Sequence, residues 1–325
     1  MSSSIILGVE TSCDESAIAL VENGRKIVSS LVESQISIHE TYGGVVPEIA
    51  SRYHVKAITD LVEKTFQASD VKPEQLSAIA CTQGPGLTGT LLVGLNTAKA
   101  LSYAWNLPLY GVNHLYAHVA SCFLESDLEP PFLALLVSGG HTELYIFESY
   151  DSFKLIGSSL DDACGEAFDK IARILGLKYP GGPGLEKLAC GGDLNYIKFP
   201  IAKINDFNFS FSGLKTNVFR YCQKNPDFDK SSVAACAQYA IVDALWEKTL
   251  LAIKTFKADK LVVCGGVSAN EFLRQKFKQG LKIPVYYPNL KYCTDNAAMI
   301  ASAAYFKPKA IGYDAKVFSR SGLDV

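Results

Sequence analysis

The N-terminal part of the chain alternates short apolar runs with polar turns. Residues 17–21 are apolar, as are residues 5–10 up to the closing Glu10, and the segment that joins the two runs is polar. Apolar runs of this length, bounded by turn residues, are typical of buried strands. Asn23-Gly24 follows the second run, and this dipeptide favours the tight turn of a β-hairpin.

The same plan returns in the second half of the chain. Residues 132–137 and 144–147 are apolar and flank a Ser-Gly-Gly-His turn. In each half a later buried strand then leads through a glycine turn, at 84–89 and at 265–270, into a helix. This repetition predicts an internal duplication of one α/β unit.

Longer segments carry apolar residues at helical spacing. The helices expected from this spacing are 47–69, 89 to about 105, 165–175, 231–257, one through 272–277, and one from 295 to 305. Strands that alternate with helices predict an α/β fold of two lobes with a cleft between them.

The expected lobes divide the chain near its middle. The first lobe is predicted at 1–125 and the second at 130–294, the second with a helical insertion. A C-terminal helix at 295–325 is expected to pack back onto the first lobe.

Composition changes the picture little, since it is that of an ordinary globular protein. Of 325 residues, 48% are hydrophobic and 20% are charged, enough for two packed domains. No apolar run approaches the roughly 20 residues that span a bilayer, and the first strand follows without a signal-like leader. These features predict a cytoplasmic protein without membrane contact. The net charge of -2 argues against bulk coating of nucleic acid, so any RNA binding uses a local patch.

Two histidines have the spacing of a metal site. His114 and His118 stand one turn apart on a predicted helix, which suits two bonds to one divalent ion. Ordinary surface histidines are the commoner outcome of this spacing, so a third, anionic ligand is needed. Asp295 is a candidate, although a carboxylate at a helix start also serves as an N-cap. Two histidines and a carboxylate with open positions suit Fe(II) or Zn²⁺.

Two glycine turns indicate a nucleotide. Ser138-Gly139-Gly140 and the turn at 265–270 follow buried strands, so their backbone N–H groups can approach a phosphate. Each alone is a plain tight turn about as often as a nucleotide site. Their occurrence in duplicated lobes favours a nucleotide held between the lobes.

Four acidic residues lie near turns where they could act on a substrate. Asp169 and Glu186 flank a glycine-rich bend and are suited to accept the hydroxyls of a ribose. Asp14 and Glu15, in the first polar turn, are suited to orient an amine or accept its proton. The alternative for each of them is a solvated acid with no such role.

Seven motifs together resemble the TsaD family, over about residues 5–305. They are Gly8-Val9-Glu10-Thr11-Ser12-Cys13-Asp14-Glu15, Tyr42-Gly43-Gly44-Val45-Val46-Pro47-Glu48, His114 with His118, Leu136-Val137-Ser138-Gly139-Gly140-His141-Thr142, Phe209-Ser210-Phe211-Ser212-Gly213-Leu214-Lys215, Gly265-Gly266-Val267-Ser268-Ala269-Asn270 and Cys293-Thr294-Asp295-Asn296. The Val-Val-Pro-Glu segment resembles the bacterial and organellar branch of that family.

The resemblance implies a fold, an activity and a site. The fold is the actin/Hsp70/sugar-kinase-like (ASKHA) fold, with two duplicated α/β lobes and a central nucleotide and metal cleft. The activity is transfer of threonylcarbamoyl from threonylcarbamoyl-adenylate to N6 of the adenosine next to the anticodon, in tRNAs that read codons starting with A. The implied metal ligands are His114, His118 and Asp295, with Fe(II) favoured over Zn²⁺. The implied contacts to the adenylate are Leu136, Val137, Ser138, Gly139, Gly140, Asp169, Gly182, Glu186 and Asn270.

The resemblance also implies partners. Relatives bind tRNA and work with TsaB-like and TsaE-like proteins, while the organellar form acts as a homodimer. Two other functions stay open, an ATPase or small-molecule kinase of the ASKHA type and a non-catalytic scaffold in a tRNA-modifying complex. A kinase would hold Mg²⁺ through substrate phosphates and gives the histidine pair no role. A zinc protease would need a glutamate after the first histidine, where this chain has Leu115.

Overall fold

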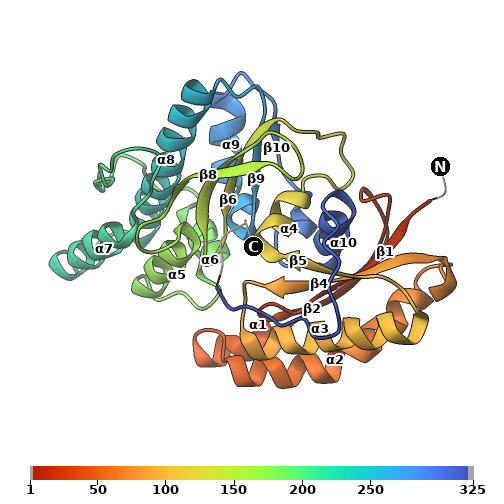
Figure 1. The fold of residues 1–325 in the computed structure, drawn as a ribbon. Helices are drawn as coiled ribbons and strands as arrows, with labels where there is room; N and C mark the ends of the chain where they lie inside the picture. Colours follow the sequence, from red (N-terminus) through yellow and green to blue (C-terminus); the bar gives the residue numbers. More distant parts are fainter. Residues whose placement is uncertain (1–2, 321–325) are drawn as a thin grey trace. The chain divides into compact units, whose positions relative to one another are not determined.

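The computed structural model describes residues 3–320 and divides into two compact units, each drawn in Figure 1. The first unit runs through Glu129 and resumes at Pro288, and the second is Pro130–Tyr287. The stretch after Tyr287 belongs with the first unit because its helix packs against strands of that unit. The expectations for residues 1–2 and 321–325 lie outside the described residues.

The first unit is built on a five-stranded sheet in the order β3-β2-β1-β4-β5. Its strands are β1 (Ile5–Glu10), β2 (Glu15–Glu22), β3 (Lys26–Ser34), β4 (Leu76–Gly84) and β5 (Leu109–Asn113). β1, β2 and β3 are antiparallel neighbours, whereas β4 and β5 are parallel to β1. Asn23 and Gly24 both have positive φ, 51° and 68°, which confirms the predicted hairpin turn.

Helices cover both faces of this sheet. They are α1 (Ile36–His39), α2 (Pro47–Gln67), α3 (Thr88–Trp105), α4 (His114–Ala120) and α10 (Ala297–Phe306), with short 3-10 turns at Glu40–Tyr42, Pro73–Gln75 and Leu290–Tyr292. Figure 1 shows α2 and α3 on one face of the sheet and α4 and α10 on the other. The core between sheet and helices holds aliphatic side chains such as Leu7, Ile18 and Leu61.

The helix predicted from 295 to 305 is confirmed as α10, whereas the longer helix predicted at 295–325 is wrong within the described residues. α10 ends at Phe306, because Pro308 lacks the amide hydrogen that a further helical turn requires. The following segment instead makes a single antiparallel bridge, between Ala310 and Tyr110.

The second unit repeats the topology of the first. Its sheet has the order β8-β7-β6-β9-β10. This order corresponds strand by strand to β3-β2-β1-β4-β5 of the first sheet, with β6 in the place of β1. The strands are β6 (Phe132–Val137), β7 (Thr142–Phe147), β8 (Phe153–Ser158), β9 (Leu261–Cys264) and β10 (Val285–Tyr286). β6 pairs antiparallel with β7 and parallel with β9, as β1 does with β2 and β4. The predicted internal duplication is therefore confirmed.

The helices of the second unit are α5 (Cys164–Ile174), α6 (Gly181–Ala189), α7 (Ser212–Lys224), α8 (Lys230–Phe256) and α9 (Glu271–Gly280), with a 3-10 turn at Gly266–Ala269. The helices predicted at 165–175 and 231–257 are confirmed as α5 and α8. The prediction missed α7, because only Leu214 and Val218 of that helix are buried and its apolar stripe is short. None of the described helices combines the length and the apolar character that crossing a membrane requires.

Candidate functional site

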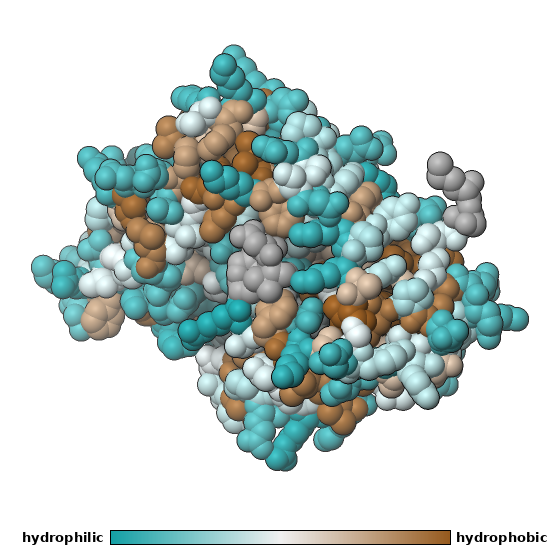
Figure 2. Space-filling model, in the orientation of Figure 1, coloured by the Kyte–Doolittle hydropathy of each residue, from teal (hydrophilic) through white to brown (hydrophobic). Residues whose placement is uncertain are grey.

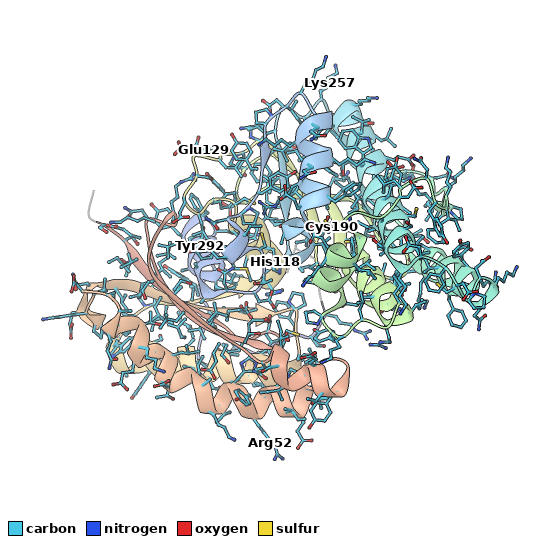
Figure 3. All side chains as sticks on the ribbon, turned by 180° about the vertical axis from the view of Figure 1, so that it is seen from behind. Arg52, His118, Glu129, Cys190, Lys257 and Tyr292 are labelled. Atoms are coloured by element: carbon cyan, nitrogen blue, oxygen red, sulfur yellow. The ribbon has the colours of Figure 1, made fainter. Side chains whose placement is uncertain are left out.

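His114 and His118 stand one turn apart on α4, as predicted. The side chain of Asn113 caps this helix by accepting hydrogen bonds from the amides of Leu115 and Tyr116. The cap fixes the start of the helix and with it the position of the first histidine. The two imidazole rings are 4.6 Å apart between centroids. His118, labelled in Figure 3, is only 2% exposed, so it is not an ordinary surface histidine.

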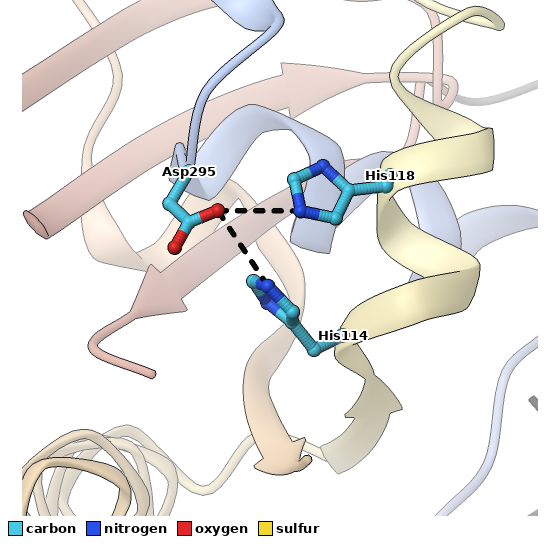
Figure 4. Close-up of side chains that lie close together, drawn as sticks. All are labelled: His114, His118 and Asp295. Atoms are coloured by element: carbon cyan, nitrogen blue, oxygen red, sulfur yellow. Dashed lines mark ion pairs between the residues drawn. The ribbon is translucent and has the colours of Figure 1, made fainter. Parts of the chain in front are cut away.

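The Asp295 carboxylate faces both histidines. Its Oδ1 atom lies 3.5 Å from Nε2 of His114 and 3.3 Å from Nε2 of His118 (Figure 4). The alternative role of Asp295 as an N-cap is wrong. Asn296 caps α10 instead, by accepting a hydrogen bond from the Met299 amide at 3.0 Å. The neighbouring asparagine thus leaves the Asp295 carboxylate turned toward the imidazoles.

These three side chains have the spacing of ligands to one ion. Their candidate ligand atoms all lie within 4.8 Å of one another. Nitrogen and oxygen ligands bound tetrahedrally at about 2.0–2.1 Å lie about 3.3 Å apart, and the two carboxylate–imidazole distances are 3.3 and 3.5 Å. The arrangement therefore fits a divalent metal, and the donor set of two imidazoles and one carboxylate leaves coordination positions for a substrate.

The pKa shifts of His114 and Asp295 bear on how a cation would bind at the point where these three side chains converge. Burial opposes a charged imidazolium at His114, but the carboxylates of Asp295 and Glu10 outweigh it and raise the pKa of His114 to about 9. Burial likewise opposes a charged carboxylate at Asp295, but His114 and His118 hold its pKa below the usual range. At neutral pH a protonated His114 therefore lies beside an ionised Asp295. A divalent ion that binds there replaces a proton, so its affinity rises with pH.

Glu10 contacts His114 at the ring nitrogen opposite the one that faces Asp295, and the sequence analysis did not single it out. The side chain is fully buried at the end of β1, and its Oε2 atom lies 3.2 Å from Nδ1 of His114. The Ser12 amide and the Thr82 hydroxyl also donate hydrogen bonds to this carboxylate. A carboxylate at this ring nitrogen fixes the tautomer that turns the Nε2 lone pair toward a metal. The signal available in the sequence was a glutamate at the end of an apolar strand.

Asp14 and Glu15 are buried, 6% and 9% exposed, so the alternative of solvated acids is wrong for both. Burial, together with the charges of Asp295 and Asp14, raises the pKa of Glu15 to about 10. The Glu15 carboxyl is therefore neutral at pH 7. The Ser34 hydroxyl donates a hydrogen bond to its Oε1 atom, at 3.3 Å. A catalytic role for either residue stays a prediction.

The remaining predicted residues lie in the second unit, where the two glycine turns meet. A Cβ atom added at Gly265 would lie 2.4 Å from the carbonyl oxygen of Val137, at the start of the other turn. Gly265 also has a positive φ of 89°, which favours glycine. Cβ atoms added at Gly139 and Gly140 would meet nothing within 4 Å among the described residues, so space remains beside this turn. Leu136 is fully buried in β6, as is Val137.

Asp169 holds the start of α6. Its Oδ1 atom accepts hydrogen bonds from the amides of Gly181 and Gly182, at 2.7 and 3.2 Å. Burial raises the pKa of Asp169 even though these amides oppose the rise. One oxygen of this carboxylate thus has a structural role. A contact between Asp169 and a ribose stays a prediction.

Glu186 and Asn270 both support the start of α9. Glu186 accepts a hydrogen bond from the Glu271 amide, at 2.6 Å. Asn270 accepts one from the Leu273 amide and donates one to Gln238, both at 2.9 Å. These bonds fix the glycine turn that precedes α9. The predicted contacts of both side chains to an adenylate are not tested by this geometry.

Comparison with known sequences gives close relatives over most of the chain. The sequence model of the TsaD family, described as tRNA N6-adenosine threonylcarbamoyltransferase, matches residues 26–302. A protein of that name from Caldicellulosiruptor saccharolyticus is 48% identical over 311 residues, which are 93% of each chain. Another, from Clostridium perfringens strain SM101, is 49% identical over 319 residues, which are 94% of each chain.

Comparison with solved structures agrees on the fold. T. kodakarensis HypF matches with a TM-score of 0.65 and 13% identity, over 94% of this chain and 47% of that one. The chain thus spans about half the length of HypF. Component A of the (R)-2-hydroxyglutaryl-CoA dehydratase of Acidaminococcus fermentans matches with a TM-score of 0.55 and 15% identity, over 94% and 98% of the two chains. At such identities these structures show the fold alone, and they confirm the predicted ASKHA class.

Proposed function

Because the chain belongs to the TsaD family of tRNA N6-adenosine threonylcarbamoyltransferases, we propose that it transfers threonylcarbamoyl from threonylcarbamoyl-adenylate to N6 of the adenosine next to the anticodon. In this reaction the carbamoyl carbon forms a bond to N6, its bond to the phosphate oxygen breaks, and AMP leaves. The observation that carries the proposal is the convergence of His114, His118 and Asp295 within 4.8 Å. Neither the kinase nor the scaffold alternative gives those three residues a role.

The first unit supplies the metal ligands in this proposal. His114, His118 and Asp295 hold one divalent ion, with Fe(II) favoured over Zn²⁺ by the resemblance. When bound, such an ion polarises a carbonyl oxygen of the substrate. Glu10 keeps the Nδ1 proton of His114 in place, so that Nε2 stays available as a ligand.

Asp14 and Glu15 are proposed to act on the adenine amine. The attacking N6 atom must lose a proton, and a neutral carboxyl cannot take it. Because the pKa of Glu15 is raised to about 10, we assign to Glu15 the orientation of the amine and to Asp14 the acceptance of its proton. Positioning supplies much of the rate, since an adenine amine is a weak nucleophile.

The second unit is proposed to bind the adenylate. The open space beside Gly139 and Gly140 supports a phosphate approached by backbone amides. The proposed contacts are Leu136 and Val137 through their backbone, Ser138, Gly139, Gly140, Asp169, Gly182, Glu186 and Asn270. The TsaB-like and TsaE-like partners, the homodimer and the cytoplasmic location stay predictions from the sequence.

The test is transfer of labelled threonylcarbamoyl from its adenylate to an unmodified tRNA transcript, with candidate partner proteins present. The variant is His114→Ala/His118→Ala, and the control is Asp60→Ala/Lys64→Ala, which removes an exposed ion pair on α2. We expect the histidine variant to lose both bound metal and transfer while it stays folded by circular dichroism. Transfer that survives in that variant would overturn the metal assignment. A wild type that modifies no transcript would overturn the function itself.

A further inference from the structure

We infer that the exposed face of α7 is a docking surface for the phosphate backbone and an unstacked base of the tRNA substrate. This inference rests on the proposed function, because it takes tRNA as the substrate. It adds a site in the second unit that the metal ligands and the adenylate contacts do not include. The face consists of Lys215, Phe219, Arg220 and Lys224, and we refer to it as the α7 face.

The charge of the α7 face is one-sided. The segment 207–226 contains Lys215, Arg220 and Lys224 and no acidic residue, in a chain whose net charge is -2. Within residues 3–320 the side chains of these three cations have no ion pair or hydrogen bond. Some cations elsewhere are paired: on α2, for example, Arg52 and Lys64 each bond to an acid one turn earlier. A polyanion is the partner that such a concentration of unpaired cations fits.

The helix arranges these cations on the side away from the core. Leu214 and Val218 are the buried residues of α7, and both lie on one side of the helix. At 100° per residue, Lys215 and Phe219 form one row along the helix, and Arg220 and Lys224 form a second row about 140° further round, so the two rows flank the outward side of the helix. In the region that α7 occupies in Figure 1, the space-filling view in Figure 2 shows hydrophilic colour mixed with pale and hydrophobic colour. A nucleic-acid backbone that crosses the outward side of α7 would therefore meet cations on both flanks of the helix.

An aromatic side chain lies in the middle of the α7 face. Phe219 is 47% exposed and, in the described part of the chain, stacks on no other ring. Other large apolar side chains of the chain are also exposed, but Phe219 lies on the same helix as three unpaired cations. Unstacked bases in RNA loops bind on such rings, and neighbouring cations hold the phosphates. The presence of both Phe219 and the cations favours RNA as the partner. An acidic protein segment would use the cations but would have no need of an exposed aromatic ring.

The start of α7 is held rigidly. The Asp161 carboxylate accepts hydrogen bonds from the amides of Phe211 and Ser212, at 2.8 and 3.3 Å. It also accepts them from the hydroxyls of Ser210 and Ser212, at 2.5 and 2.8 Å. α7 packs against α5, the helix that carries Asp169. The α7 face is therefore fixed to the same unit as the proposed adenylate contacts before any tRNA binds.

The first test removes the charges. Binding of an unmodified tRNA transcript is measured for wild type, for Lys215→Ala/Arg220→Ala/Lys224→Ala, and for the control Lys254→Ala/Lys278→Ala/Lys282→Ala. The control removes the same charge from exposed positions elsewhere in the second unit. We expect the α7 variant to bind tRNA about 10- to 100-fold more weakly near 0.1 M salt, with a salt slope lower by about 2 to 3. Metal content and the KM for the adenylate should not change, and the control should change tRNA binding less than about twofold.

The second test removes the ring. Phe219→Leu should weaken tRNA binding by about tenfold, and Phe219→Tyr should restore it, because tyrosine keeps the stacking surface. Equal losses in the charge variant and its control, or no loss in either, would overturn the α7 face as the site. So would loss of binding to a partner protein while tRNA binding stays normal. A wild type that neither binds nor modifies tRNA would instead overturn the proposed function, and no α7 variant would then differ from it.

Discussion

The Glu10 carboxylate lies 3.2 Å from Nδ1 of His114, at the ring nitrogen opposite the one that faces Asp295. His118 has no such support, since its buried Nδ1 atom has no hydrogen-bond partner among the described residues. The two histidines are therefore not equivalent. A carboxylate that accepts the Nδ1 proton makes the imidazole a stronger ligand and fixes its orientation. His114 is the histidine whose contribution to metal binding depends on a second residue.

Glu10→Gln tests this dependence. The substitution keeps the size of the side chain but removes the charge, and it places an amide group among donors. We expect the affinity for Zn²⁺ or Co²⁺, measured by titration against a competing chelator, to fall about 10- to 100-fold. Glu48→Gln, at an exposed position on α2, is the control and should leave the affinity unchanged. An unchanged affinity in a folded Glu10→Gln variant would contradict the role of Glu10.

Sequence reasoning could single out the three proposed metal ligands because each is marked by a short local pattern. His114 and His118 are one helical turn apart, and Asp295 lies in a recognisable motif beside a helix start. Glu10 escaped because its role depends on a pairing between β1 and the start of α4, more than 100 residues apart in the chain. Nothing in the residues around Glu10 shows which side chain it will face.

The fold shows the same division between local and distant information. α8 could be predicted because its long apolar stripe gives fourteen buried positions, whereas α7 has two. The duplicated strand order could also be predicted, since each unit repeats the same succession of apolar runs and glycine turns. The burial of Asp14 and Glu15 could not, because it is created by elements that follow much later in the chain.

His54 should make the protein sensitive to mild acid. The ring is fully buried, with Nε2 2.9 Å from the Cys13 carbonyl and Nδ1 2.6 Å from the Ser16 hydroxyl. Burial lowers the pKa of His54 from its ordinary value of 6.5, although the charges of Glu10 and Asp14 oppose this. The unfolded chain therefore binds a proton at a higher pH than the folded chain does. The stability that His54 contributes is present above pH 6.5 and is lost as the pH falls toward the lowered pKa.

His54→Gln removes this titration while keeping hydrogen-bonding groups. At pH 7 we expect the variant to be less stable by about 1–3 kcal/mol, because buried polar groups lose partners. Its thermal midpoint should then fall less than that of wild type between about pH 7 and 5. Thermal unfolding followed by circular dichroism across this range gives the comparison. Parallel pH profiles for the two proteins would show that His54 is not the group responsible.

Asp161→Asn should loosen the start of α7. Although burial opposes it, the pKa of the Asp161 carboxyl is lowered by the hydroxyls and amides that bond to it. Because this carboxyl is exposed to solvent, we expect a loss of only about 1 kcal/mol at pH 7, the usual scale for a helix cap. The difference from wild type should shrink as the pH falls through the lowered pKa, since protonation removes the same charge. Urea unfolding at several pH values measures this, with Asp151→Asn, in an exposed turn, as the control.

Gly8→Ala should disrupt the contact between β1 and α10. A Cβ atom at Gly8 would lie 2.2 Å from the carbonyl oxygen of Ala297 and 3.0 Å from the Ala301 amide nitrogen. Backbone cannot move aside as a side chain can, so α10 would have to shift, at a cost of about 2–4 kcal/mol. Since Asp295 directly precedes this helix, the same shift should weaken metal binding. Gly213→Ala is the matched control: its added Cβ meets nothing within 4 Å among the described residues, and alanine should stabilise α7 by about 0.5–1 kcal/mol. A Gly8→Ala variant as stable as wild type in thermal unfolding would mean that β1 and α10 do not pack this closely.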